Sequence, residues 1–329
     1  MPKEKSNLVF RAEVNTFAKN HKIMTQSKNI SKYSLAVAAF LTLALFVSYR
    51  SGDFGGSDAR FDSLTQVVRS VNINQSYDLA GEPIPMDNFD VVERLDRELI
   101  ANSYLHGSTI LNIKLAHRYF PFMEKILADN NIPDDMKYLA VIESNLRNAT
   151  SPAGAKGIWQ FMEGTARQYS LEVSAEVDER YHIEKCSRAF CSFIKDCKQK
   201  FGSWTLAAAA YNGGPGRISG ELANQRAANF YQLNLTEETM RYPFRIVAMK
   251  EIMKNPRFYG YFVKDEGLYK VLDDFTEVVV TGKVDNWGDF AKQYGTDFRT
   301  LKIYNPWLIG SSLMNKMGKS YTIKIPKKS

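Results

Sequence analysis

The chain has 329 residues, of which 44% are hydrophobic, and a formal net charge of +7 at pH 7. This length is sufficient for one substantial hydrophobic core and a smaller second module. A basic balance suits nucleic acid, an anionic membrane or an acidic polymer as a partner. The basic residues are nevertheless spread along the chain, apart from residues 1–32 and the Lys327-Lys328 end, and no nucleic-acid-binding motif is present. We therefore expect no nucleic-acid partner.

An uncharged apolar run at residues 33–49 follows a basic arm at residues 1–32. The run is slightly shorter than the ~20 residues of a full membrane span. Because the positive charge precedes it, the positive-inside rule places the arm in the cytoplasm and everything after Arg50 outside. We predict an uncleaved, single-pass signal anchor. A cleaved signal peptide and a buried core helix are the alternatives; the long basic arm and the missing small-x-small site disfavour the first, and the one-sided charge disfavours the second.

The middle of the chain has helical periodicity. Residues 50–88 begin with a Gly- and Ser-rich tether and are predicted to be a linker. From Val91 onward apolar residues recur at helical spacing with no convincing strand, which predicts an all-α domain over residues 89–262. The expected helices cover residues 91–105, 110–129, 134–145, 159–169, 183–201, 203–212, 217–228 and 237–253.

Residues 275–327 have a different pattern. Short β-branched strands are predicted at 277–281 and 321–325, with two short helices at 287–294 and 298–304 between them. This β-α-α-β order predicts a small independent module.

Three cysteines, Cys186, Cys191 and Cys197, lie within one predicted helix. Their spacings place no two of them where a disulfide could form. We interpret them as small apolar packing residues.

Glu143 is the candidate for chemistry. It lies in the run YLAVIESNL at 138–146, in which Leu139, Ile142 and Leu146 share one helical face. Apolar surroundings and the negative end of a helix dipole both favour the protonated form of a carboxyl group. A general acid must have that form near neutral pH. A solvated or ion-paired glutamate is the ordinary alternative.

The residues that follow favour a sugar site. Gly154 and Gly157 allow tight turns and close approach of the backbone. Trp159, Gln160 and Phe161 then supply aromatic surface and an amide. Pyranose faces stack on aromatic rings and sugar hydroxyls bond to amides, so this mixture is typical of such sites.

Four segments occur in a characteristic order: the pair Glu143-Ser144, GAKGIWQF at 154–161, AYNGGPG at 210–216 and ETMRY at 238–242. Together they resemble the lytic transglycosylases with a goose-type lysozyme-like fold, most closely the membrane-bound lytic murein transglycosylase D group. The resemblance departs at two points. Gly213 stands where Ala or Met is usual, and Pro243 follows the last motif. Proline disfavours α geometry at the preceding residue, which leaves the orientation of Tyr242 open.

The C-terminal module resembles a LysM domain, a class that binds polymers containing N-acetylglucosamine. The matching features are Trp287, Tyr294-Gly295, Leu301, Asn305-Pro306 and Ile325-Pro326. The usual opening of Tyr-x-Val followed by Gly-Asp is missing. Whether this copy still binds glycan therefore stays open.

The resemblance implies cleavage of the β-1,4 bond between N-acetylmuramic acid and N-acetylglucosamine in peptidoglycan, with a 1,6-anhydromuramoyl product and no metal or cofactor. Glycosidases ordinarily use two carboxylates. No second acid in the four segments is placed as a nucleophile, so we expect a substrate-assisted reaction with Glu143 as acid and then base. Peptidoglycan strands are the expected partner, and both domains are expected in the periplasm.

The resemblance also implies a set of polar and aromatic residues in contact with substrate. These are Ser144, Gln160, Phe161, Tyr211, Asn212, Glu238 and Tyr242. A helix cap is the alternative role for Ser144 and a loop brace for Gln160. A core position is the alternative for Tyr211 and, in part, for Phe161, and a helix end for Asn212. For the whole chain, a non-catalytic peptidoglycan-binding scaffold and a lysozyme- or chitinase-type hydrolase are the alternative functions.

Overall fold

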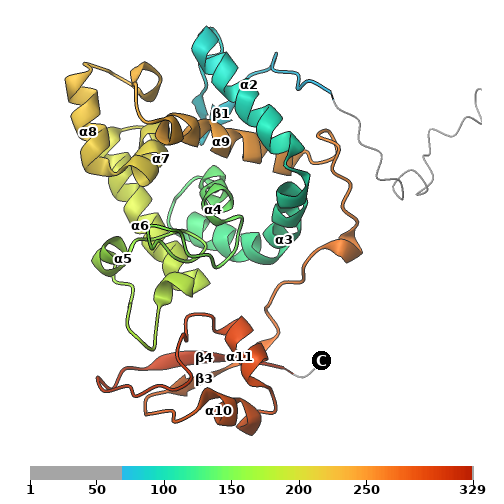
Figure 1. The fold of residues 1–329 in the computed structure, drawn as a ribbon, viewed down its shortest axis with the longest axis vertical. Helices are drawn as coiled ribbons and strands as arrows, with labels where there is room; N and C mark the ends of the chain where they lie inside the picture. The colour runs from blue at the N-terminus through green and yellow to red at the C-terminus, as the bar shows by residue number, and fades with distance from the viewer. Residues whose placement is uncertain (1–68, 328–329) are drawn as a thin grey trace, which may run out of the picture. The chain divides into compact units, whose positions relative to one another are not determined.

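The computed structural model describes residues 69–327 (Figure 1). The predicted anchor at 33–49 and the basic arm before it lie outside the described residues. Within 69–327, no helix combines the length and the apolar character that a membrane span requires.

Helices make up most of the described chain, as predicted. In chain order they are α2 (Phe89–Tyr104), α3 (His106–Asp129), α4 (Lys137–Ser144), α5 (Glu163–Gln168), α6 (Ile183–Phe201), α7 (Trp204–Gly213), α8 (Pro215–Asn224) and α9 (Glu237–Lys254), with short 3-10 turns η2 (Asp134–Met136), η3 (Glu179–Tyr181), η4 (Phe230–Gln232) and η5 (Asp265–Gly267). Helix α9 packs against α2, α4 and α7, and α6 packs against α3 and α7. Figure 1 shows α4 near the middle of this group.

Helix α6 illustrates why the helical prediction works. Its buried side chains recur at helical spacing, and Gly202 ends it in the left-handed conformation with φ of 70°. Cys186, Cys191 and Cys197 are all buried and free. Burial raises the pKa of both the Cys191 and the Cys197 thiol to about 11. The three are therefore inert packing residues, which confirms the interpretation from the sequence.

One predicted helix starts later than expected. The sequence predicts a helix over 159–169, but α5 begins at Glu163. Residues 157–161 instead form a tight turn in which Gln160 has a φ of 52°. Lys156 and Phe161 exchange backbone hydrogen bonds across that turn. The competing turn, set by the left-handed residues, overrides the helical periodicity.

The predicted linker at 50–88 was wrong at its C-terminal end. Residues 78–83 form a small hairpin of β1 (Asp78–Leu79) and β2 (Glu82–Pro83). Tyr77, Leu79 and Ile84 are buried in the core of the helical part. Strands of two residues are too short to produce a periodic pattern, so hydrophobic periodicity does not predict them.

Glu82 of this hairpin caps helix α7. Its carboxylate accepts hydrogen bonds from the backbone N–H groups of Trp204 (2.5 Å) and Thr205 (2.9 Å) and from the Ser203 hydroxyl (2.7 Å). Burial opposes the charged form, but these bonds lower the pKa of Glu82 to about 2. A carboxylate at a helix N-terminus satisfies otherwise unpaired donors and complements the dipole. The hairpin thus fixes the start of α7.

We expect Glu82→Ala to destabilise the protein by about 2 kcal/mol, because it removes this cap. The folded-state pKa lies below that of an unfolded glutamate. The stabilisation is therefore fully present above the unfolded pKa and is lost as the pH falls toward about 2. Urea unfolding at pH 7 and pH 3 checks this, since the difference between wild type and variant should shrink at pH 3. An equal difference at both pH values would contradict the cap.

The C-terminal module has the predicted β-α-α-β order. It consists of β3 (Phe275–Val280), α10 (Trp287–Gln293), α11 (Phe298–Tyr304) and β4 (Tyr321–Pro326). The strands pair antiparallel, with Phe275 opposite Pro326 and Val280 opposite Tyr321. Alternating side chains of β4 enter a core of the module's own.

Candidate active site

Glu143 lies on the last turn of α4, as predicted. The helix forms because residues 138–141 are apolar and buried. It ends at Ser144, and the next residue, Asn145, has a left-handed φ of 51°. Leu146 also has a positive φ and a fully buried side chain. The chain therefore turns sharply just after the glutamate. That turn places the Glu143 carboxyl at the end of the helix, where the dipole opposes a negative charge.

Tyr242 of α9 contacts this carboxyl directly. Its hydroxyl donates a hydrogen bond to Oε1 of Glu143 at 2.6 Å. Burial raises the pKa of Glu143, and the charge of Glu238 adds to the rise. The Tyr242 hydrogen bond and the positive charge of Arg245 act in the other direction, but the pKa stays above that of an ordinary glutamate. Glu143 can therefore hold a proton at a pH where most glutamates have lost theirs.

Tyr211 of α7 lies close enough to this carboxyl to be affected by its charge. Its hydroxyl donates a hydrogen bond to the Trp159 carbonyl at 2.5 Å. Burial first, and then the charge of Glu143, raises the pKa of Tyr211 well above 10. The pKa of Tyr242 is raised for the same two reasons. Both tyrosines therefore stay protonated and act as fixed hydrogen-bond donors.

Ser144 joins α4 to the glycine-rich segment. Its hydroxyl lies 2.8 Å from the Ile158 carbonyl and 3.1 Å from the Ala140 carbonyl, and it donates to these backbone oxygens. The side chain is buried. The geometry thus supports a bracing role, which positions the helix end that carries Glu143.

Gln160 also braces this segment. Its amide nitrogen donates to the carbonyls of Gly157 (2.7 Å) and Ala149 (3.1 Å). These two bonds use both amide hydrogens. A contact between Gln160 and substrate would therefore have to use the amide oxygen.

The aromatic residues beside Gln160 lie in the core. Phe161 is only 2% exposed and makes edge-to-face contacts with Phe193 and Tyr211. Trp159 is fully buried, stacks on Phe190 and donates its indole N–H to Ser187. Both side chains therefore pack beneath residues 154–161 in the core, and neither ring is free to stack on a sugar.

Asn212 and Glu238 lie together at a more exposed edge. The Asn212 amide donates to the Glu238 carboxylate at 3.0 Å, and its carbonyl oxygen accepts from the Thr239 hydroxyl at 2.8 Å. These bonds join the end of α7 to the start of α9. Because the charge of Glu238 acts on Glu143, this pair lies within electrostatic reach of the acid.

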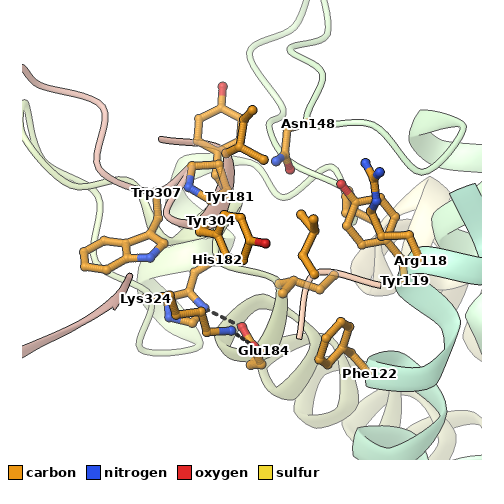
Figure 2. Close-up of a pocket in the computed structure, with 15 residues that line it drawn as sticks. Arg118, Tyr119, Phe122, Asn148, Tyr181, His182, Glu184, Tyr304, Trp307 and Lys324 are labelled. Carbon is orange, nitrogen blue, oxygen red and sulfur yellow. Dashed lines mark hydrogen bonds and ion pairs between the residues drawn. The ribbon is translucent and has the colours of Figure 1, made fainter. Parts of the chain in front are cut away.

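A pocket with a volume of about 60 Å³ lies elsewhere, between α3, the start of α6 and the C-terminal module (Figure 2). Its walls include Tyr119, Tyr181, Tyr304 and Trp307. Glu143 is not among the described residues that line this pocket. The pocket therefore belongs to the junction between the helical part and the module.

Comparisons with known proteins agree with this geometry. Residues 120–234 match the family described as the transglycosylase SLT domain, and residues 276–329 match the soluble lytic transglycosylase C-terminal LysM-like domain. The chain carries a transglycosylase SLT domain. It is 29% identical over 250 residues to membrane-bound lytic murein transglycosylase D of Escherichia coli K12, which covers 74% of this chain and 53% of that protein.

Other relatives match over shorter stretches. The soluble lytic murein transglycosylase of Escherichia coli K12 is 29% identical over 125 residues, or 35% of this chain and 18% of that protein. The chain thus spans about half the length, or less, of these two curated relatives. The structure of the 70 kDa soluble lytic transglycosylase of Escherichia coli aligns with a TM-score of 0.36 and 24% identity, over 42% of this chain and 24% of that chain.

Sequence reasoning missed Arg245, which lies on α9 beyond the residues 120–234 that match the SLT domain. It lies one helical turn after Tyr242, so both side chains share a face of α9. Its guanidinium donates to the Ile142 carbonyl at 3.2 Å, and its charge lowers the pKa of Glu143. The i,i+3 spacing from Tyr242 was the available signal.

Pro243 does not disturb Tyr242. Helix α9 runs from Glu237 to Lys254 through the proline. The Tyr242 side chain is 1% exposed, and its hydroxyl still reaches the Glu143 carboxyl. The proline lies within the first turns of the helix, where the loss of one N–H breaks only the bond to the Thr239 carbonyl.

We expect Tyr242→Phe to raise the pKa of Glu143 further, because the lost hydrogen bond stabilises the carboxylate. If protonated Glu143 is the acid, the alkaline limb of the rate profile should move to higher pH while the maximal rate falls about tenfold or more. Rate measurements from pH 4 to 9 check this. Tyr211→Phe is the matched control: its hydroxyl bonds to a backbone carbonyl, so the limb should stay in place. A limb that moves to lower pH in Tyr242→Phe would contradict the assignment.

Proposed function

We propose that this chain is a peptidoglycan lytic transglycosylase that cleaves the β-1,4 bond between N-acetylmuramic acid and N-acetylglucosamine. The observation that carries the proposal is the Glu143 carboxyl, whose pKa is raised by burial and whose position is fixed by the Tyr242 hydroxyl. The SLT domain around it and the relatives named as lytic murein transglycosylases support the proposal. We also propose that the helical part has a goose-type lysozyme-like fold.

The reaction proceeds in two steps. Protonated Glu143 gives its proton to the glycosidic oxygen, and the bond from that oxygen to the anomeric carbon of muramic acid breaks. The substrate's own acetamido oxygen attacks the anomeric carbon and forms an oxazolinium ring. Glu143, now a carboxylate, takes the proton from the muramic C6 hydroxyl, whose oxygen attacks the same carbon and reopens the ring. The product is a 1,6-anhydro sugar, Glu143 regains its proton and no water is consumed.

The environment of Glu143 suits both steps. Burial keeps the acid form available for the first step. The Tyr242 hydroxyl and the Arg245 charge then stabilise the carboxylate that the first step creates. The opposing influences on one pKa thus match the two roles of one residue.

The remaining predicted residues form the walls of the proposed site. Asn212 and Glu238 stand at its exposed edge and are proposed to contact the glycan. Gln160 offers its amide oxygen, and Tyr211 is proposed to hold the acetamido group. Ser144 and Phe161, which the sequence placed with the ligands, act by supporting the loop.

Digestion of purified sacculi tests the proposal against its alternatives. Anhydro-muropeptides among the soluble products support a lytic transglycosylase. Reducing muramic ends would show a lysozyme-type hydrolase, and binding to sacculi without release would show a non-catalytic scaffold. Either of the last two outcomes would overturn the proposal.

We further propose that the chain is anchored in the cell membrane by residues 33–49, with both domains in the periplasm. The name of the relative from Escherichia coli supports membrane association. Glycan binding by the LysM-like module stays a separate prediction. Sedimentation of Glu143→Gln with sacculi, competed by chitin oligosaccharides, would measure it.

A further inference from the structure

The SLT domain contributes one segment, residues 172–184, to the core of the LysM-like module. Val177 is fully buried and packs in the module's own hydrophobic cluster, together with residues such as Val284 and Leu308. The Asp178 N–H donates to the Trp307 carbonyl at 2.9 Å. The module is therefore completed by a residue from the SLT domain.

Charged pairs flank this apolar contact on both sides. Glu172 accepts hydrogen bonds from Lys319 (2.9 Å) and from the Tyr321 hydroxyl (3.2 Å). Glu184 pairs with Lys324 of β4 and with His182, as Figure 2 shows beside the junction pocket. These bonds outweigh the effect of burial and lower the pKa of Glu184 to about 2. Glu184 therefore stays ionised at neutral pH, and its contact with Lys324 holds β4 to the SLT domain.

The segment at residues 172–184 also contacts the glycine-rich loop, residues 154–161. Asp178 and Arg180 form a two-point ion pair with distances of 2.8 and 2.7 Å, and they are only 1% and 3% exposed. The remaining Arg180 nitrogen lies 3.4 Å from the carbonyls of both Gly154 and Phe161. The Arg180 carbonyl lies so close to Gly157 that a Cβ there would approach it to 1.9 Å. Loop residues 154–161 are thus packed directly onto Arg180.

The loop in turn contacts the elements that position the acid. Its Ile158 carbonyl accepts from Ser144, the neighbour of Glu143 in sequence. Its Trp159 carbonyl accepts from Tyr211, whose pKa responds to the Glu143 charge. A continuous set of contacts therefore runs from the module, through Asp178 and Arg180, to the last turn of α4.

We propose that the LysM-like module is a positioning element of the active site, which holds Val177 and Asp178 so that Arg180 fixes the glycine-rich loop beside Glu143. Val177, Asp178 and Arg180 are positioning residues in this proposal, since they act through the loop. This role does not depend on glycan binding by the module. Its kinetic consequence rests on the proposed function, whereas its structural consequence does not.

Val177→Asp in the full chain tests the proposal, because it places a charge in the module's core. Val279→Asp is the matched control, since Val279 lies on β3 but is 64% exposed. Hydrogen exchange is followed by mass spectrometry. We expect exchange in residues 154–161 to rise about tenfold or more in Val177→Asp and to stay unchanged in the control. On short soluble glycan strands, kcat should fall about 10- to 100-fold with little change in KM.

A charge reversal at the Lys319–Glu172 pair, which flanks the Val177 contact, repeats the test in case Val177→Asp does not fold. Lys319→Glu should repel Glu172, loosen the junction and raise exchange in residues 154–161. Adding Glu172→Lys should restore wild-type exchange and kcat, which loss of overall stability would not do. Faster exchange of the Asp178 and Ile309 amides, which bond across the junction, reports release of the module.

Two results would overturn the proposal: release of the module with unchanged exchange in residues 154–161, or release with full kcat. A wild-type protein that makes no anhydro product would instead overturn the proposed function. The exchange result would then still decide whether the module fixes the loop.

Discussion

Glu143→Gln is expected to abolish measurable formation of anhydro product, with a fall in kcat of about 10²- to 10⁴-fold. Glutamine keeps the size of the side chain and can still accept a hydrogen bond from Tyr242, but it has no proton to donate to the glycosidic oxygen. It also cannot take the proton from the C6 hydroxyl in the second step. Rate measurements on purified sacculi check the loss. Full activity in the variant would show that another residue is the acid.

The same variant should fold normally, which separates chemistry from stability. Burial raises the pKa of Glu143 in the folded state. The carboxyl's contribution to stability is therefore present below the pKa of an unfolded glutamate and is lost as the pH rises through the folded-state pKa. Above that pH the buried charge is a cost that glutamine does not carry. We thus expect an unfolding midpoint at pH 8 equal to or above that of the wild type.

Gly157→Ala should be the most destabilising glycine-to-alanine substitution in the loop at residues 154–161, with a loss of about 3–5 kcal/mol in the free energy of unfolding. Gly157 has a φ of 82°, and an added Cβ would meet the Arg180 carbonyl oxygen at 1.9 Å. A backbone oxygen cannot move aside as the end of a flexible side chain can. Either the loop or the Arg180 segment must therefore shift. Urea unfolding measures the loss.

Gly154→Ala is the control for this prediction. Gly154 has a similar φ of 88°, but an added Cβ would have no neighbour within 4 Å. In this variant the free energy of unfolding should fall by only about 1 kcal/mol, which is the cost of an alanine in the left-handed conformation. Equal losses at the two glycines would mean that φ, and not contact with Arg180, explains the requirement at Gly157.

Much of the helical part was predictable because its signals are local. Glu143 was found from an apolar run that ends in a turn, and α4 ends at Ser144, one residue before the expected end at 145. The strands and helices of the C-terminal module were found by the change of period from 3.6 to 2. Such patterns depend on neighbours in sequence and need no knowledge of tertiary contacts.

The features that the sequence did not predict depend on residues far apart in the chain. Glu82 accepts a hydrogen bond from the N–H of Thr205, which lies 123 positions away in the sequence, so no local sequence pattern predicts this contact. The role of Arg180 depends equally on the fold, since a buried arginine has no local signature. Gln160 and Phe161 were predicted to contact substrate, from the family resemblance and because aromatic residues and amides are common in sugar sites. In the fold, the Gln160 amide nitrogen bonds to the loop and Phe161 packs in the core, which leaves the Gln160 amide oxygen for the proposed substrate contact.

The junction between the SLT domain and the module also lay beyond sequence reasoning. A β-α-α-β pattern predicted an independent unit, but Val177 from the SLT domain lies in that unit's core. A single valine between polar residues has no periodicity that could reveal this contact. The contact between the two domains is therefore visible only in the packed structure.

In the proposed reaction one carboxyl, Glu143, serves as both acid and base, and no water is used. Digestion of sacculi in water enriched in heavy oxygen, followed by mass spectrometry of the released muropeptides, tests it most directly. We expect 1,6-anhydro products without the heavy isotope from the wild-type protein and no release by Glu143→Gln. Incorporation of one heavy oxygen at the muramic end would show that water attacks the anomeric carbon, and would rule out the proposed reaction.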